Sequence, residues 1–480
     1  MNPLNVSFLQ ELMNNVADQG RALLPSALFG GDDTRSMQKL VNALVSGQGE
    51  ASGVAIAQEI LVQYGKLGKD ERRDFFIYLA EALRPDPSKI NAAAERYISD
   101  GDDAALIKLQ SAVESPRQEF FRRLNLAPGA TAQLVEMRRD LSRLLHDAPE
   151  LRIVDRDIRH LFYSWFNRGF LILRRIDWQT PASILEKIMK YEAVHEIRDW
   201  NDLRRRLDPC DRRCFAFFHP ALVDEPLIFV EVALMNETPA AIRPVLDEPA
   251  ANEALREPTT AVFYSISNCQ EGLKGISFGS FLIKQVVDEL LKDMPTLKTF
   301  VTLSPVPRFA RWLDRVMADD SIHHLTPDDR NAFAQLQDPG WPDDDISEDA
   351  IKSSLMALAA EYFLRAKTAE GKPIDPVARF HLGNGARLEQ INWLGDPSEK
   401  GLREGHGLMV NYRYDPKDIE TNHEAFVNDG AISASRAVRG LLRAQPKVKQ
   451  TGETITNQTG TLLMLPGART KRTSVDGEAD

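Results

Sequence analysis

The chain has very few cysteines. Only three of its 480 residues are cysteine: Cys210, Cys214 and Cys269. They are too few and too clustered for a disulfide framework, and Cys210 and Cys214 lack the second ligand pair that completes a zinc site. The cysteine content therefore predicts no metal site, and it favours a reducing compartment, the cytoplasm.

The chain also lacks an excess of basic residues and a long apolar run. It carries 59 Lys and Arg against 70 Asp and Glu, a net charge of -11, whereas a surface that neutralises nucleic-acid phosphates is normally basic. No stretch approaches the roughly 20 apolar residues of a membrane helix, and the start of the chain has no secretory pattern. We expect a soluble protein with neither a nucleic-acid nor a membrane partner.

Apolar residues recur at helical spacing through the first third of the chain. The clearest examples are Met37–Val45, Val54–Tyr64, Asp74–Leu83 and Thr131–Leu145. This region has no glycine loop and no cluster of histidines or paired carboxylates, and helices of this kind usually exist to pack. We predict an all-helical N-terminal bundle domain over residues 1–168, which serves as a scaffold or an oligomerisation surface.

The residue composition changes after about residue 205, where runs rich in β-branched and aromatic residues predict strands. They are Cys214–His219, Pro226–Leu234, Thr260–Ser267 and Thr299–Leu303, and a helix is predicted at Phe281–Leu291. The fold class is therefore α+β, with a mixed α/β catalytic domain over residues 169–445. Residues 446–480 are polar, with few apolar groups, and predict a disordered tail.

A glycine-containing turn, Gly272–Ser280, lies between the third predicted strand and the predicted helix. Backbone N–H groups at a helix N-terminus attract anions, and glycine lets a pyrophosphate come close. The turn matches neither the dinucleotide fingerprint nor the P-loop, so nicotinamide and ATP sites lose support. On this pattern alone an ordinary strand-to-helix loop is the favoured interpretation, because such loops are common.

Two polar residues stand in settings that suit catalysis. Ser304 ends the last predicted strand and precedes Pro305-Val306-Pro307, so we expect an exposed, rigid hydroxyl at the rim of the sheet. His381 follows apolar residues and precedes a glycine-asparagine turn, which favours a partly buried, neutral imidazole. Other histidines, His195 among them, have charged or helical neighbours and are expected at the surface. A lone serine or histidine is ordinary at a structural turn, so neither residue decides the function by itself.

Several segments together resemble one known family over residues 160 to 414. They are Phe263-Tyr264-Ser265-Ile266-Ser267, Gly272-Leu273-Lys274-Gly275, Gly279-Ser280-Phe281-Leu282-Ile283-Lys284, Leu303-Ser304-Pro305-Val306-Pro307, Phe380-His381-Leu382-Gly383-Asn384-Gly385-Ala386, Ile391-Asn392-Trp393 and Gly407-Leu408-Met409-Val410-Asn411-Tyr412-Arg413-Tyr414. With these blocks in this order, the chain resembles a bacterial member of the malonyl-CoA decarboxylase family.

The resemblance implies a helical N-terminal domain, a catalytic domain of the acyl-CoA N-acyltransferase type, and a homo-oligomer, either a dimer or a tetramer. It also implies that Ser304 and His381 act together. The substrate-binding turn corresponds to Lys274, Gly275, Ile276, Ser277, Phe278, Gly279 and Ser280. Lys274 and Ser277 stand where animal members have glutamine and glutamate, which puts any role of a carboxylate at position 277 in doubt.

The reaction that the resemblance implies is that of a carboxy-lyase of fatty-acid and malonate metabolism. Malonyl-CoA loses CO2 and becomes acetyl-CoA through an enolate, which the site must stabilise and then protonate. The thioester itself accepts the electron pair, so we expect no metal and no organic cofactor. Three alternatives stay open: an acyl-CoA N-acyltransferase, a serine thioesterase that uses Ser304 as nucleophile, and a module that senses acyl-CoA without turnover.

Overall fold

The structure is a computed structural model of the whole chain, and it describes residues 15–22, 34–47, 49–247, 257–276, 282–318, 325–337, 341 and 348–443. The chain divides into two units, residues 1–442 and 443–480. Only Arg443 of the second unit is described, so the tail predicted for residues 446–480 lies outside the described residues.

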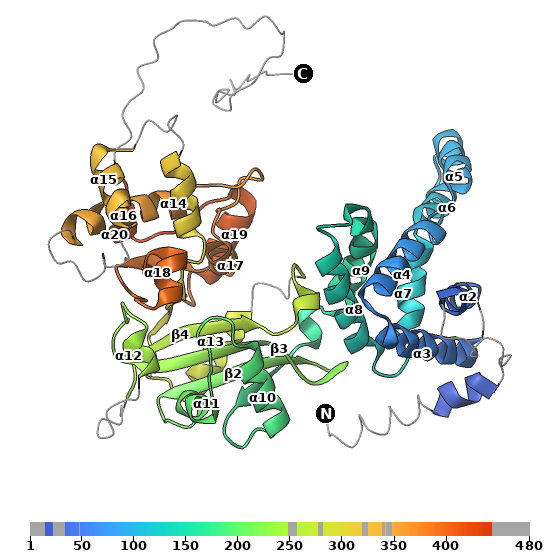
Figure 1. Cartoon of the computed structure of the whole chain (residues 1–480), viewed down its shortest axis with the longest axis horizontal. Helices are drawn as coiled ribbons and strands as arrows, with labels where there is room; N and C mark the ends of the chain where they lie inside the picture. Colours follow the sequence, from blue (N-terminus) through green and yellow to red (C-terminus); the bar gives the residue numbers. More distant parts are fainter. Residues whose placement is uncertain are drawn as a thin grey trace, which may run out of the picture. The chain divides into compact units, whose positions relative to one another are not determined.

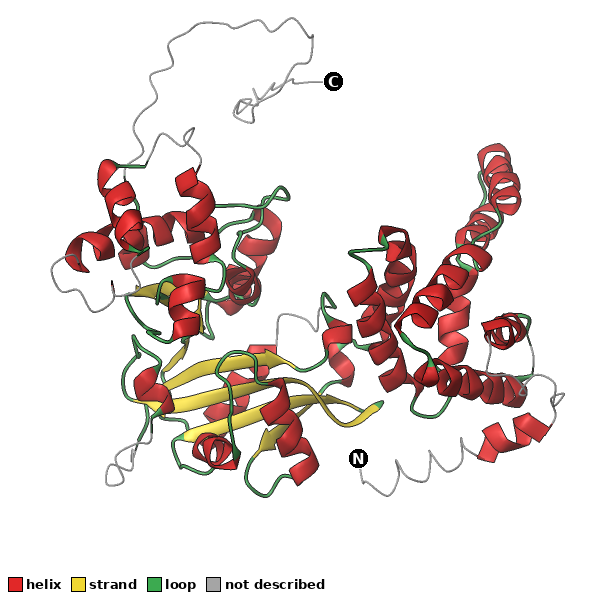
Figure 2. Cartoon of the chain, in the orientation of Figure 1, coloured by secondary structure: helices red, strands yellow, loops and turns green. Residues whose placement is uncertain are grey.

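The first third of the described chain is helical, as the apolar periodicity predicts (Figures 1 and 2). The helix α9 shows why: its apolar side chains at positions 154, 158, 161 and 162 recur at helical spacing, and all are buried. The helices of this region are α2 (Thr34–Val45), α3 (Glu50–Lys66), α4 (Lys69–Ala82), α5 (Pro87–Asp100), α6 (Asp103–Val113), α7 (Pro116–Leu124), α8 (Ala130–Leu144) and α9 (Arg152–Trp165).

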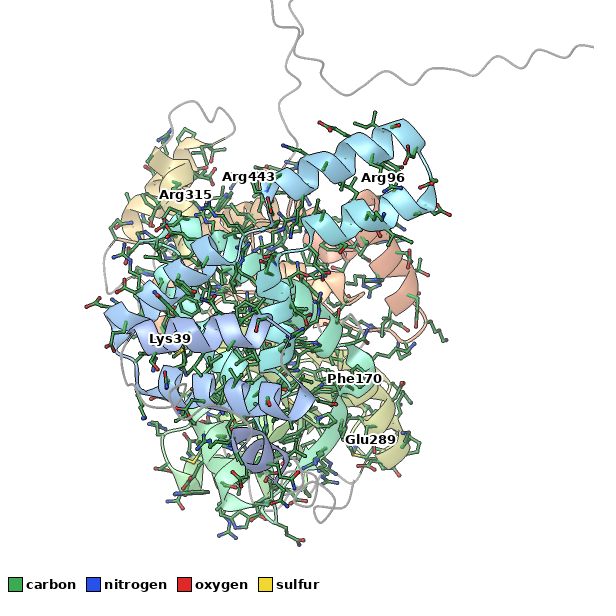
Figure 3. The ribbon with its side chains drawn as sticks, turned by 90° about the vertical axis from the view of Figure 1, so that its right-hand side faces the viewer. Lys39, Arg96, Phe170, Glu289, Arg315 and Arg443 are labelled. Carbon is green, nitrogen blue, oxygen red and sulfur yellow. The ribbon has the colours of Figure 1, made fainter. Side chains whose placement is uncertain are left out.

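The helices of this region differ in how much they bury. The helix α5 has no buried residue, and its Arg96 is exposed at the edge of the view in Figure 3, where it pairs with Asp100 on the same helix. The helix α7, by contrast, buries Arg117, which forms an ion pair with the Asp157 carboxylate of α9 at 2.8 Å. The region therefore packs around its inner helices, and α5 contributes little to the core.

The later part of the chain contains one mixed sheet of eight described strands. The strand order is β1-β2-β3-β4-β5-β8-β6, with β7 beside β8, and only β4 and β5 pair in parallel. The strands are β1 (Ile172–Ile176), β2 (Arg212–His219), β3 (Leu222–Met235), β4 (Thr260–Asn268), β5 (Thr299–Thr302), β6 (Ser304–Pro305), β7 (Arg387–Asn392) and β8 (Met409–Arg413). All four predicted strands are confirmed, and so is the α+β class.

The strands β4 and β5 pair at their first residues and then separate. Their last paired residues are Phe263 and Thr302. The chain then turns away from β4, because Ser304 of β6 pairs with Val410 of β8. The helix α13 (Leu282–Asp293), which confirms the predicted helix between these strands, makes the crossover connection. The diverging strands leave an opening in the sheet beyond Phe263.

Further helices surround the sheet. Figure 1 shows α10 and α11 against the strands β2 and β3, and α17 and α18 among the segments that follow β6. These helices are α10 (Ala182–Tyr191), α11 (Trp200–Leu207), α12 (Arg243–Leu246), α14 (Phe309–Ala318), α15 (Pro327–Gln335), α16 (Glu348–Leu364), α17 (Pro376–Gly383), α18 (Glu399–Gly405), α19 (Ile419–Asp429) and α20 (Arg436–Gly440).

The apolar core is continuous between the helical region and the sheet. One cluster of buried residues contains Val135 and Phe162 of the helices together with Phe263 of β4 and Leu273 of the turn that follows it. Burial of such side chains stabilises a fold by about 1.5–3 kcal/mol each. The helical region therefore packs directly against the part of the chain that carries the glycine turn.

The described ranges contain neither a membrane-spanning helix nor a group of metal ligands. No helix within them combines the length and the apolar character that crossing a membrane requires. Within the same ranges no three His, Cys, Asp or Glu side chains are grouped as metal ligands. The cysteines Cys210, Cys214 and Cys269 are all free thiols.

Candidate active site

The glycine turn begins with a short 3-10 helix, η4 (Glu271–Leu273), after β4. Gly275 has φ +79°, a left-handed conformation that glycine adopts without strain. Lys274 and Gly275 are exposed, and Ile276 is buried. Of the other predicted substrate-binding residues, Ser277, Phe278, Gly279 and Ser280 lie outside the described residues.

Ser304 lies in the two-residue strand β6, and it is only 6% exposed. The prediction of an exposed hydroxyl at the rim is therefore wrong. The prolines do not end the pairing of the chain, because Ser304 and Pro305 pair with Val410 and Met409 of β8 instead of with β4. This neighbouring strand covers the serine that the sequence placed at an open edge.

His381 lies in the last turn of α17. Pro376 is the first residue of this helix, and the Asp375 side chain caps it by accepting the Ala378 backbone N–H at 2.7 Å. The second Asp375 oxygen accepts the Tyr362 hydroxyl at 2.8 Å. The helix that presents the histidine is therefore fixed at its N-terminus by a buried carboxylate.

The structure brings Ser304 and His381 together, although 76 residues separate them in the chain. The Ser304 Oγ lies 3.2 Å from the His381 Nε2, and the other ring nitrogen, Nδ1, lies 2.8 Å from the Tyr414 hydroxyl. The imidazole also stacks on the Tyr412 ring, with the centroids 4.5 Å apart. Both nitrogens and one face of the ring are therefore in contact with the protein.

Burial decides the charge state of these groups. It lowers the pKa of His381 from 6.5 to about 3, because the charged imidazolium loses its hydration. Burial also raises the pKa of the Tyr414 hydroxyl well above 10. At neutral pH the histidine is a neutral imidazole beside a protonated tyrosine, as the sequence predicts for His381.

The hydrogen bonds around Ser304 indicate which ring nitrogen carries the proton. The Ser304 hydroxyl donates to the Thr302 Oγ1 at 2.9 Å, and this oxygen also accepts the Tyr412 backbone N–H at 3.1 Å. Since the serine proton is directed at Thr302, the serine oxygen accepts from His381 Nε2–H, and Nδ1 accepts the Tyr414 hydroxyl. The site is a directed chain of hydrogen bonds from Tyr414 through His381 and Ser304 to Thr302.

Ser304 and His381 open onto a small pocket of about 230 Å³ between the diverging strands and α17. None of the described residues that line it is charged. The lining is Val194, Phe263, Tyr264, Ile266, Asn268, Ser304, Pro305, Pro376, Val377, Phe380 and His381. In such an apolar setting a hydrogen bond to a developing charge is worth more than in water.

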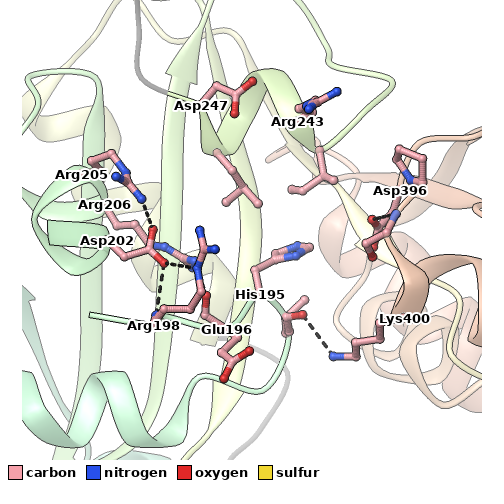
Figure 4. A pocket seen from close by; sticks show the side chains of 15 residues that line it. His195, Glu196, Arg198, Asp202, Arg205, Arg206, Arg243, Asp247, Asp396 and Lys400 are labelled. Carbon is pink, nitrogen blue, oxygen red and sulfur yellow. Dashed lines mark hydrogen bonds and ion pairs between the residues drawn. The ribbon is translucent and has the colours of Figure 1, made fainter. Parts of the chain in front are cut away.

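A second, larger hollow of about 1010 Å³ shares the lining residue Val194 with this pocket, and Figure 4 shows its lining. Its wall carries arginines and carboxylates, such as Arg205, which bonds Asp202 at 2.6 Å, and neither Ser304 nor His381 lines it. His195 contributes to this wall with a buried Nε2 that has no hydrogen-bond partner among the described residues. The side chain as a whole is partly buried, so the prediction of a surface position for His195 is only partly correct.

Two members of the hydrogen-bond chain, Tyr414 and Thr302, are absent from the site that the sequence predicts. Tyr414 follows β8, a strand that the sequence patterns do not predict, and it lies in the last of the resembling blocks. Thr302 belongs to the same predicted strand as Ser304, two residues earlier, where alternation puts both side chains on one face. That alternation is the signal that could have found Thr302.

The comparisons with known proteins agree with one another. A family model described as the malonyl-CoA decarboxylase C-terminal domain matches residues 169–452, and one described as the N-terminal domain matches residues 83–166. The mitochondrial malonyl-CoA decarboxylase of Anser anser anser is 36% identical over 365 residues, which are 70% of this chain and 72% of that protein. The mitochondrial enzyme of Mus musculus is 33% identical over 359 residues, 70% of this chain and 73% of that protein.

Solved structures are also similar. The malonyl-CoA decarboxylase of Rhodopseudomonas palustris is 54% identical, with a TM-score of 0.82, over 85% of this chain and 99% of that one. The malonyl-CoA decarboxylase of Agrobacterium vitis is also 54% identical, with a TM-score of 0.81, over 85% of this chain and 100% of that one.

Proposed function

Since the chain belongs to the malonyl-CoA decarboxylase family, we propose that Ser304 and His381 carry its reaction and that Tyr414 and Thr302 orient them. The enzyme is a carboxy-lyase that converts malonyl-CoA to acetyl-CoA and CO2. The observation that supports the residue assignment is the directed hydrogen-bond chain in the wall of an uncharged pocket.

The first step is the loss of CO2. The bond between the carboxylate carbon and C2 breaks, and its electron pair moves into the thioester, whose oxygen becomes that of an enolate. In the free site the His381 Nε2–H is directed at Ser304 and the Ser304 hydroxyl at Thr302, and each of them turns to the thioester oxygen when the substrate enters the pocket. A donor aimed at a developing oxyanion typically lowers the barrier by about 3–4 kcal/mol.

The second step returns one proton to C2. The Ser304–His381 pair delivers this proton as a unit, and solvent restores it when the product leaves. Tyr414 keeps the imidazole in the required tautomer, because its hydroxyl stays protonated and donates to Nδ1. The negative charge moves through the thioester, so the proposed reaction uses neither a metal nor an organic cofactor.

The direction of the chain argues against a serine thioesterase. A nucleophilic serine needs its proton aimed at the histidine that removes it. Here the Ser304 hydroxyl donates to the Thr302 Oγ1 at 2.9 Å, and the His381 Nε2 lies farther from the serine oxygen, at 3.2 Å. The serine proton is therefore not aimed at the histidine, as a nucleophilic serine would require.

Other proposals rest on the family and on the composition of the chain. We propose that Lys274, Gly275 and Ile276 contact the coenzyme together with Ser277, Phe278, Gly279 and Ser280, and that the catalytic domain is of the acyl-CoA N-acyltransferase type. The separation of β4 from β5 beside the reaction pocket supports both proposals. We also propose the domain limits 1–168 and 169–445, a cytoplasmic location, which the free cysteines support, and a homo-oligomer.

A product assay tests the proposed function. The purified protein is incubated with malonyl-CoA, and CO2, acetyl-CoA and free coenzyme A are measured separately. We expect CO2 and acetyl-CoA in equal amounts and no free coenzyme A. Release of coenzyme A without CO2 would support the thioesterase instead, and acetyl transfer to an added amine would support the N-acyltransferase. Binding of malonyl-CoA with no product at all would support the sensing module.

A further inference from the structure

A third hollow, of about 670 Å³, lies between the helical region and the glycine turn. One wall comes from α8, which contributes Val135, Arg139 and Arg143, and the other comes from residues 268–276 after β4. Asn268 lines both this hollow and the reaction pocket, and the neighbouring residues Ala193 and Val194 line one each. The hollow is therefore adjacent to the place where the thioester reacts.

Side chains of the helical region donate hydrogen bonds to backbone carbonyls of the glycine turn. The guanidinium of Arg138 donates to the Gly272 carbonyl at 2.5 Å and to the Lys274 carbonyl at 3.1 Å, and the Tyr163 hydroxyl donates to the Gly275 carbonyl at 2.9 Å. Arg138 is itself held by Asp155 at 2.8 Å. These bonds hold three carbonyls of the turn to α8 and α9.

The two chain segments approach each other too closely for a side chain. A Cβ on Gly272 would lie 1.9 Å from the Val135 carbonyl oxygen, well inside contact distance. Glycine at this position therefore allows α8 to touch the turn. The shape of the hollow is fixed by the fold, since its two walls are joined by hydrogen bonds and by this close contact.

Four cationic side chains line the hollow, two from each side of the contact: Arg139 and Arg143 of α8, and Lys190 and Lys274 of the later chain. Within the described part of the chain, Lys190 and Lys274 form no ion pair with a carboxylate. Arg143 pairs with Glu271 at 2.5 Å, but their side chains are 61% and 48% exposed. An exposed pair of this kind is worth little, so a phosphate can compete for the arginine.

The carboxylates of the hollow are largely occupied. Glu192 accepts the Val194 and His195 backbone N–H groups at 2.7 Å each, and its other oxygen accepts the Ser265 hydroxyl at 2.7 Å. Glu136 pairs with Arg139 at 3.1 Å. Arg139 also pairs with Asp140 at 3.1 Å. A polyanion in the hollow therefore meets the two lysines first, and it replaces carboxylate partners of the two arginines.

We propose that the phosphorylated nucleotide end of the coenzyme A thioester binds in this hollow, with Arg139 and Arg143 of the helical region as half of its cationic ligands. The inference rests on the proposed function, which places the thioester in the adjacent pocket. It assigns the helical region a direct part in substrate binding, beyond the scaffold role that its sequence predicts. It also makes the enzyme selective for coenzyme A esters over esters of the bare pantetheine arm.

The test compares two substrates on one enzyme. Malonyl-CoA carries the phosphorylated nucleotide, and malonyl-pantetheine lacks it. For the double variant Arg139→Gln/Arg143→Gln we expect KM for malonyl-CoA to rise roughly 10-fold or more, with kcat within about 2-fold of the parent, because the charge-assisted contacts to the phosphates are lost. A tenfold change in affinity corresponds to about 1.4 kcal/mol. KM for malonyl-pantetheine should not change. A matched control, Arg96→Gln on α5, should change neither value.

A binding assay keeps the proposal testable if the double variant is poorly folded. Adenosine 3′,5′-bisphosphate should inhibit the parent enzyme competitively with malonyl-CoA, and inorganic phosphate at the same concentration should inhibit far less. Charge-conserving substitution, Arg139→Lys/Arg143→Lys, should restore most of the lost affinity. An unchanged KM for malonyl-CoA in the glutamine variant, or an equal rise for both substrates, would overturn the proposal.

The two proposals fail differently. If the parent protein produced no CO2 from malonyl-CoA while adenosine 3′,5′-bisphosphate still bound in calorimetry and the glutamine variant lost that binding, the proposed reaction would be wrong and the nucleotide site would stand. If CO2 were produced with equal efficiency from both substrates, the nucleotide site would be wrong and the reaction would stand.

Discussion

The reaction pocket and the nucleotide hollow are neighbours with opposite physical character. The pocket is uncharged, and its polar groups are buried and hydrogen-bonded to one another. The hollow is lined by exposed cations and carboxylates that exchange partners easily. Buried, oriented donors act on a transition state, whereas exposed charges bind ground state and transition state alike. Changes in the pocket should therefore affect kcat, and changes in the hollow should affect KM.

The largest expected change in kcat follows from removal of a hydrogen-bond donor in the reaction pocket. We expect His381→Ala and Ser304→Ala each to lower kcat by about 100- to 1,000-fold, because the enolate loses a preorganised partner. KM for malonyl-CoA should stay within about 3-fold, since the nucleotide end is bound elsewhere. Steady-state kinetics measure both values, and near-normal kcat in either variant would remove that residue from the mechanism.

The contact between α8 and the turn gives the next largest effect. In Gly272→Ala the new methyl group meets the Val135 carbonyl, so the turn must move away from α8. We expect the free energy of unfolding to fall by about 1–3 kcal/mol, as overpacking usually causes, and KM for malonyl-CoA to rise. Urea denaturation measures the first quantity.

The control for this substitution is Gly53→Ala within α3, where an added Cβ meets nothing within 4 Å. Alanine in a helix interior should raise the free energy of unfolding by about 0.5–1 kcal/mol. If both alanines had the same effect, the close approach at Gly272 would not constrain the fold.

A smaller fall in kcat is expected when the group that orients the His381 ring is removed and the ring itself is kept. Tyr414→Phe removes the hydroxyl that donates to His381 Nδ1 but keeps the ring. Loss of one such hydrogen bond, at about 0.5–1.5 kcal/mol, corresponds to a 3- to 10-fold fall in kcat. The fall in kcat should be the same at pH 6 and pH 8, because the two neutral tautomers of the ring carry the same number of protons. A merely structural tyrosine would lower the free energy of unfolding and leave kcat of the folded variant at the parent value.

The smallest expected effect is that of pH on the parent enzyme. The pKa of His381 is lowered to about 3, so the imidazole stays neutral between pH 5 and pH 8, and kcat should change little there. The linkage to stability has a definite sign: the unfolded chain takes up a proton near pH 6.5 and the buried histidine does not, so this residue lowers the free energy of unfolding as pH falls below 6.5. An acidic limb of kcat near pH 6.5 would show that His381 titrates normally.

The sequence patterns predict the elements with clear apolar runs well and the elements of mixed composition poorly. The strands β2 and β3 and the helix α13 follow from runs and periodicities that stand out. The strands β7 and β8 do not, because polar and charged residues interrupt their apolar residues. The wrong expectation for Ser304 has the same origin, since it is β8 that covers the serine.

The sequence by itself determined the α+β class and the family, and it predicted Ser304 and His381 as site residues, because these depend on residue types in a fixed order along the chain. Only the tertiary structure decided that the serine is buried and that its proton points to Thr302. It also decided that the Tyr414 hydroxyl lies 2.8 Å from the Nδ1 of His381 and that helices far upstream hold the glycine turn. Each of these contacts joins segments that are remote in the chain. Local sequence patterns carry no information about the distance between such segments, which is set only when the chain folds.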